Sequence, residues 1–175
     1  MLPPVHLAVG YLCYAALVRF RGHGAPAERA TLAALLGAAL PDLIDKPIHW
    51  LGVVPVGRTI GHSLLLALPL VALVWVLARR AGERELGVAF AVGILSHIAT
   101  DVPWHLVSGE YHELGFLLWP VTHMPEYTGT ATLGTLAGVE VTTLWIEAVI
   151  LVCGVALWVA DGTPGAGVVK ERLGD

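Results

Sequence analysis

Five long apolar segments dominate this sequence and restrict the folds that it can adopt. They lie at about residues 4–20, 29–45, 62–78, 86–104 and 136–160. A helix needs roughly 20 mainly apolar residues to cross the hydrocarbon core of a bilayer, and each segment is close to that length. The sequence therefore predicts an all-α, polytopic integral membrane helix bundle with about five transmembrane helices.

The second segment has the shortest uninterrupted apolar run, because Pro41-Asp42 interrupts it before residue 45. Proline removes a backbone donor, so this segment is expected to close there and is a candidate for a half-spanning helix. The expected organisation is one membrane-embedded domain over residues 1–160, followed by a flexible cytoplasmic tail over residues 161–175.

Composition excludes several other classes of protein. Charged residues make up 14 % of the chain, against about 25 % in soluble domains. The formal net charge of −4 gives no electrostatic reason to expect a nucleic-acid partner. Cys13 and Cys153 both lie in apolar runs, which is typical of small buried hydrophobic residues rather than of a disulfide framework.

The positions of Lys and Arg predict the orientation. Of the ten such residues, Lys46 and Arg58 lie on one side of the expected spans and the others lie on the opposite side. Cytoplasmic loops carry an excess of Lys and Arg. The N-terminus is therefore expected outside and the C-terminus in the cytoplasm, in the inner or plasma membrane.

Histidines and carboxylates gather at the outer ends of four of these segments. Because residues four apart share a helix face, His97 and Asp101 can reach one ion. The full set is His6, Asp42, Asp45, His62, His97 and Asp101. Imidazole and carboxylate donors without a thiolate suit zinc, manganese or iron. The pattern predicts a divalent metal site of one or two ions near the outer membrane face, more typical of catalysis than of structure.

Three further residues are candidates for this site. Arg58 lies where basic residues are scarce, so its guanidinium would bind a phosphate or carboxylate group, or else reach from the membrane to the interface. His123, in the long loop before the last span, is a candidate substrate contact. Glu140 lies near the outer end of the last span and is a possible additional site residue.

Four short motifs resemble those of the YdjM-like family of inner-membrane metal-dependent hydrolases. They begin at His6 (HLAVG), Gly37 (GAALPD), Arg58 (RTIGHS) and Gly93 (GILSHIATD). The resemblance covers roughly residues 3–125. It implies a hydrolytic activity and a metal-binding set of His6, Asp42, His62, His97 and Asp101.

The chain departs from the family pattern in two places. The second acidic residue, Asp45, comes three positions after Asp42 instead of two, which sets its role as a ligand in question. Gly57 precedes Arg58 where the family often has a histidine, and Gly61 precedes His62 where it often has a threonine.

These features together predict a membrane-bound hydrolase in which a divalent ion, zinc above all, activates water. Asp45 is expected to act as general base, while Arg58 and His123 contact the substrate. A site at the membrane surface favours an amphiphilic substrate such as a phosphoester of a lipid.

Two other classes remain open at this stage. One is a small transporter or channel subunit, in which Asp101, His97 and Glu147 relay protons. The other is a membrane partner protein that binds another subunit through the loop at residues 102–135. The histidines and carboxylates would then form hydrogen bonds between helices instead of binding an ion.

Overall fold

The structure, a computed structural model, describes residues 2–108, 111–124 and 141–173. In chain order its elements are α1 (Pro3–Phe20), α2 (Glu28–Trp50), α3 (Leu64–Arg80), α4 (Arg84–Ser108), the 3-10 helix η1 (Tyr111–Leu118), α5 (Val141–Ala160) and α6 (Ala166–Leu173). No strand occurs among these residues, so the prediction of an all-α fold is confirmed.

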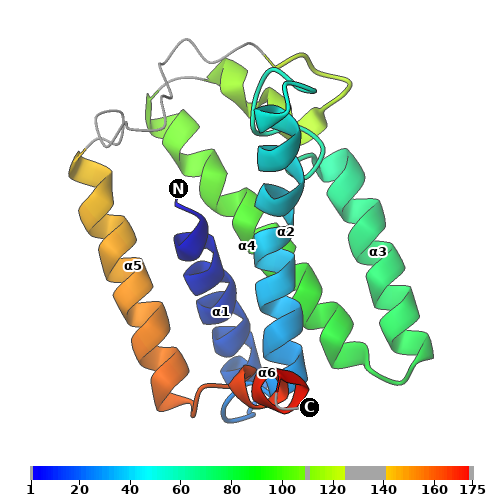
Figure 1. The fold of residues 1–175 in the computed structure, drawn as a ribbon, viewed down its shortest axis with the longest axis vertical. Helices are drawn as coiled ribbons and strands as arrows, with labels where there is room; N and C mark the ends of the chain where they lie inside the picture. The colour runs from blue at the N-terminus through cyan, green and yellow to red at the C-terminus, as the bar shows by residue number, and fades with distance from the viewer. Residues whose placement is uncertain (1, 109–110, 125–140, 174–175) are drawn as a thin grey trace.

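Helices α1, α2 and α4 form the centre of the bundle, and each packs against the other two. Helix α3 packs on α4 at one edge, and α5 packs on α1 at the other edge (Figure 1). The 3-10 helix η1 contacts α3 and α4 at the end of the bundle where α3 begins. This end, formed by the upper parts of α2 and α4 in Figure 1, holds the predicted site residues.

Two glycines allow α2 and α4 to cross with their backbones almost in contact. A Cβ atom on Gly93 of α4 would collide with the carbonyl oxygen of Ala34, and one on Gly37 of α2 would collide with that of Phe90. Small residues at helix crossings permit close approach in membrane proteins. The crossing brings the backbone of α2 within reach of the side chains that follow Gly93 along α4.

The two edge helices expose large apolar side chains instead of burying them. Contiguous apolar surface of this kind is unusual on a soluble monomer, and a lipid environment accounts for it. On α3 the exposed residues include Leu65, Leu68, Leu73 and Trp75; on α5 they include Trp145, Val149, Val152 and Val159.

By length and composition, one helix of the described part of the chain could cross a membrane, over Arg84–Val102, with a hydropathy of 1.4. The apolar helix at Leu144–Ala160 is shorter. The five-span topology and its orientation therefore stay predictions.

Two boundaries differ from those expected. Helix α2 does not close at Pro41-Asp42 but continues through Pro41 and Pro47 to Trp50. Each proline removes only one backbone donor. The last turns of α2 are held to the following loop because the Asp45 carboxylate accepts hydrogen bonds from the N–H groups of Thr59 and Gly61. The tail expected to be flexible contains α6, because the Glu28 carboxylate accepts hydrogen bonds from the N–H groups of Gly165 (2.7 Å) and Gly167 (3.2 Å).

Candidate metal centre

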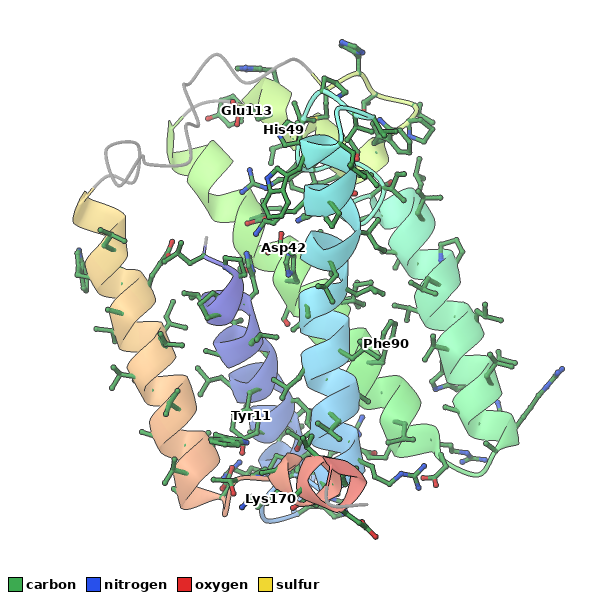
Figure 2. All side chains as sticks on the ribbon, viewed as in Figure 1. Tyr11, Asp42, His49, Phe90, Glu113 and Lys170 are labelled. Carbon is green, nitrogen blue, oxygen red and sulfur yellow. The ribbon has the colours of Figure 1, made fainter. Side chains whose placement is uncertain are left out.

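Four segments that are distant in the sequence bring polar side chains to one end of the bundle. Helix α1 supplies His6, the loop before α3 supplies His62, and the remaining groups come from α2 and α4. Figure 2 shows Asp42 in the upper half of the bundle, well separated from Lys170 at the bottom. The five residues of the expected metal-binding set do lie together in space: His6, Asp42, His62, His97 and Asp101.

The potential donor atoms form two overlapping groups, His6–Asp42–His97 and His62–His97–Asp101, and within each group they lie within 4.8 Å of one another. The Nε2 atoms of His62 and His97 are 3.0 Å apart. Asp101 places Oδ2 3.4 Å from Nε2 of His62 and Oδ1 3.6 Å from Nε2 of His6. Asp42 Oδ1 lies 3.8 Å and 3.9 Å from the Nε2 atoms of His62 and His97. Ligands about 2.0–2.2 Å from one zinc ion lie about 3 to 4 Å apart, so the spacing fits.

Each of the three imidazole rings is held through its other nitrogen. His97 Nδ1 donates to the carbonyl oxygen of Ala38 at 2.6 Å, and His62 Nδ1 donates to Asp45 Oδ2 at 2.7 Å. His6 Nδ1 lies 3.0 Å from Thr100 Oγ1. Since the Thr100 hydroxyl already donates to the carbonyl oxygen of His97, Oγ1 accepts from His6. All three rings therefore carry hydrogen on Nδ1 and present an Nε2 lone pair to the centre.

The electrostatics of this arrangement favour a cation. Two Nε2 lone pairs that face each other at 3.0 Å repel unless a proton or a metal ion lies between them. The rings of His6 and His97 are also stacked, with centroids 3.8 Å apart, and each offers a nitrogen to the same group of possible metal ligands. Outer hydrogen bonds to histidine ligands are a regular feature of metal sites. The donor set of three imidazoles and two carboxylates fits a divalent ion.

Asp45 differs from the role expected for it. Its side chain is 0 % exposed, and its carboxylate accepts hydrogen bonds from the N–H groups of Thr59 (2.7 Å) and Gly61 (2.9 Å) besides that from His62. A carboxylate with these partners is poorly placed to take a proton from water. The expectation of a general base is corrected: Asp45 orients His62 and anchors the loop before α3. The carboxylates that face the histidine Nε2 atoms are those of Asp42 and Asp101, and Asp42 is the more exposed, at 13 %.

Two cations lie at the more exposed side of the cluster. Arg58 Nε donates to Asp101 Oδ2 at 3.0 Å, and Lys46 Nζ donates to Asp42 Oδ2 at 2.6 Å. The Arg58 side chain is 24 % exposed and that of Lys46 is 32 % exposed, whereas Asp101 is 1 % exposed. Arg58 is therefore at the site, as expected, and Lys46 joins it.

The 3-10 helix η1 covers part of the cluster. Phe116, which is fully buried, meets the ring of His62 edge-on with centroids 6.2 Å apart. Ser63, next to His62, donates to the carbonyl oxygen of Trp119 at 2.6 Å. This contact holds the start of α3 against the end of η1 and shields one side of the imidazole from solvent.

One expected participant that the structure describes, His123, is not brought into the cluster. His123 is exposed after η1 and makes no hydrogen bond or ion pair with the other described residues, so the structure gives no support to its role as a substrate contact. Glu140 lies outside the described residues. Glu147, considered for proton relay, is 5 % exposed and accepts a hydrogen bond from the backbone N–H of Leu2, so it ties α5 to the start of α1.

Three contributors were missed by sequence reasoning. Thr100 follows His97 by three positions, a spacing that places it beside the histidine on one helix face and was available as a signal. Lys46 and Arg58 are the two basic residues of the sequence on the expected outer side of the predicted spans, and this scarcity was also a signal for Lys46. The sequence carried no signal for the Ala38 carbonyl, because its hydrogen bond with His97 depends on the close crossing of α2 and α4.

The model of a family described as YdjM inner membrane protein matches residues 1–163, which is most of the chain. No curated protein and no solved structure matches it.

Proposed function

The chain belongs to the YdjM inner membrane protein family, and from that premise we propose that it is a membrane-bound metal-dependent hydrolase. The resemblance seen in the sequence is thereby confirmed at the level of the family and of membrane location. The proposed activity rests on one observation above all: three imidazole Nε2 atoms and two carboxylates converge, while every Nδ1 is held by a hydrogen bond.

The proposed centre holds one ion. The two groups of donors that could bind a metal, His6–Asp42–His97 and His62–His97–Asp101, share His97. His97 has a single lone pair to offer, because its Nδ1 hydrogen is used by the Ala38 carbonyl. The two groups therefore describe one centre with up to five protein donors. Zinc is the first candidate, and manganese and iron suit the same donors.

The proposed chemistry divides between the ion and the chain. When bound, a divalent ion supplies Lewis acidity that polarises the scissile bond and makes water a better nucleophile. The chain orients the histidines through Thr100, Asp45 and the Ala38 carbonyl. Helix η1 limits the access of solvent from one side.

The proposed placement follows from the distribution of charge. Helices α1 to α5 would each cross the membrane, with the metal centre near the extracytoplasmic face. The other end of the bundle carries Arg19, Arg21, Arg29, Arg79, Arg80 and Arg84, as expected for a cytoplasmic surface. The substrate would be an amphiphile that reaches the centre from the outer leaflet. A fluorescent protein fused after Asp175 should fluoresce, and alkaline phosphatase fused there should be inactive; the reverse would overturn this orientation.

Metal analysis of the purified protein tests the proposal most directly. Protein purified in detergent without chelator should hold about one ion per chain, and the His97→Ala variant should lose it. The loaded protein should hydrolyse a generic phosphomonoester such as 4-nitrophenyl phosphate, and the variant should not. If the protein held one ion per chain but hydrolysed no phosphate ester, carboxylic ester or amide, it would be a metal-binding protein and the proposed hydrolase activity would be wrong. Less than about a tenth of an ion per chain, unchanged in the variant, would remove the metal centre as well.

A further inference from the structure

The basic residues of the outer end are few, and both of them contact the metal centre. The chain has ten Lys and Arg residues, of which Lys46 and Arg58 lie in the half that carries the site. Lys46 belongs to the last turns of α2, and Arg58 belongs to the loop before α3. Each pairs with a different carboxylate of the candidate metal set, Lys46 with Asp42 and Arg58 with Asp101. The end of α2 and the loop before α3 therefore each place one positive charge beside a different carboxylate of the candidate metal set.

Charge accounting shows what a loaded site requires. The three carboxylates of Asp42, Asp45 and Asp101 outnumber the two cations by one, so this cluster of mutually contacting groups carries one negative charge when its histidines are neutral. A bound divalent ion turns that balance into one positive charge. The loaded site would then attract an anion, whereas without Lys46 and Arg58 it would remain negative and repel one.

Exposure shows where an anion would bind. The histidines of the cluster are at most 2 % exposed, while the side chains of Lys46 and Arg58 are 32 % and 24 % exposed. These two cations are thus the groups that a ligand meets first. An ion held by Asp42 and Asp101 would compete with Lys46 and Arg58 for the carboxylate charge. Weakening those ion pairs leaves the cations more attractive to a second anion.

We propose that Lys46 and Arg58 form an anion-binding pair that holds the phosphate group of the substrate beside the metal ion. The inference rests on the proposed metal centre and narrows the substrate of that centre to phosphate compounds. A guanidinium presents a planar fork that matches two phosphate oxygens, and a lysine ammonium adds a point charge. A neutral carboxylic ester or amide would make no use of this pair.

Phosphate binding to the zinc-loaded protein tests this proposal. Inorganic phosphate would be titrated calorimetrically into wild type, Lys46→Gln, Arg58→Gln and Arg80→Gln in an uncharged detergent at low salt. Arg80 is exposed at the other end of the bundle and is the matched control. We expect each glutamine variant at positions 46 and 58 to bind phosphate at least about tenfold more weakly, with zinc content unchanged. Lys46→Arg and Arg58→Lys should recover part of the affinity, and the Arg80 variant should match wild type.

The outcomes separate this inference from the proposed function. Full zinc content with phosphate affinity unchanged in both glutamine variants would overturn the anion pair and leave the metal centre intact. Equal phosphate affinity in zinc-free and zinc-loaded wild type would also overturn it. A chain that takes up no zinc would overturn both. Dihexanoyl phosphatidic acid, titrated in parallel, identifies the source of the phosphate: tighter binding than that of inorganic phosphate supports a lipid head group, and equal binding supports free phosphate.

Discussion

Arg29 and Glu83 pair in the open at one end of the bundle, where their side chains are 64 % and 43 % exposed. At the other end Arg58 pairs with Asp101, whose side chain is only 1 % exposed. Exposed ion pairs contribute about 0–1 kcal/mol to stability. Buried charges cost several kcal/mol each to desolvate, and their mutual attraction offsets that cost only in good geometry.

The other contacts of the two ends differ in the same way. Arg21 pairs with Glu85 at the first end, and Tyr14 donates to that same carboxylate at 2.9 Å. These contacts join the end of α1 to the start of α4. At the second end one carboxylate, Asp101, contacts both His6 and His62 as well as Arg58. Burying several ionisable groups around one carboxylate lowers the stability of a fold. Such an arrangement is expected where the groups bind an ion.

The largest effect should come from His97→Ala, which removes a donor at the centre of the buried end. Loss of an outer hydrogen bond to a ligand costs about 10–100-fold in metal affinity, so loss of the ligand itself should cost at least about 100-fold. Zinc affinity, measured by competition with a chromophoric chelator, reports it. Wild-type affinity in the variant would show that the cluster is a network of helix contacts only.

Asp45→Asn should have the next largest effect, because it keeps the shape of the side chain and removes the charge that holds His62. We expect zinc affinity to fall by close to about 100-fold. The matched control is Asp161→Asn, which alters a carboxylate that is 7 % exposed and is bound by Tyr11 and Arg19 at the opposite end. Equal losses of zinc in both variants would mean that the effect is one of general stability.

Gly93→Ala should weaken the crossing of α2 and α4 on which the buried end depends. The added methyl group would collide with the Ala34 carbonyl, and overpacking of this type costs about 1–3 kcal/mol. Thermal unfolding in detergent should show a lower midpoint. Gly24→Ala, at a position with no atom near the new methyl group, should melt like wild type; a Gly93 variant that did so too would argue against the close crossing.

Thr100→Val should have a smaller effect, confined to His6. It removes the oxygen that accepts from His6 Nδ1 and preserves the volume of the side chain. Zinc affinity should fall by about tenfold, without a change in the unfolding midpoint as large as that of Gly93→Ala. An unaltered affinity would show that His6 does not need this bond to bind the ion.

Arg29→Gln should have the smallest effect and should be limited to the exposed end. The partly solvated pair with Glu83 is worth at most about 1 kcal/mol, and less at high salt. Zinc content and affinity should equal those of wild type. A loss of zinc in this variant would contradict the separation of the two ends.

Helix positions and site membership were predictable from the sequence to different degrees. The apolar runs gave α1, α3 and α4 to within a few residues, because hydrophobic length determines a helix in a lipid environment. The continuation of α2 beyond Pro41 was not predictable in this way. It depends on Asp45 binding the N–H groups of Thr59 and Gly61, and these are contacts between segments.

The candidate site shows the same limit. His6, Asp42, His62, His97 and Asp101 were identifiable because ionisable residues are rare in apolar segments. Their division of labour was not, because Asp42 and Asp45 are the same residue type three positions apart on one helix. Only the three-dimensional arrangement shows that Asp42 faces the histidine Nε2 atoms while Asp45 turns toward the loop.

The peripheral position of α5 has a consequence for the order of assembly during synthesis. Within the part of the chain that the structure describes, α5 packs on α1 and on no other helix. The last of the candidate ligands to be synthesised is Asp101 on α4. The proposed metal centre could therefore form as soon as α4 has joined α1 and α2. Helix α5 arrives afterwards and closes on the outer side of α1 through Glu147 and Leu2. Maturation of the centre and completion of the bundle are thus separable events in the life of the chain.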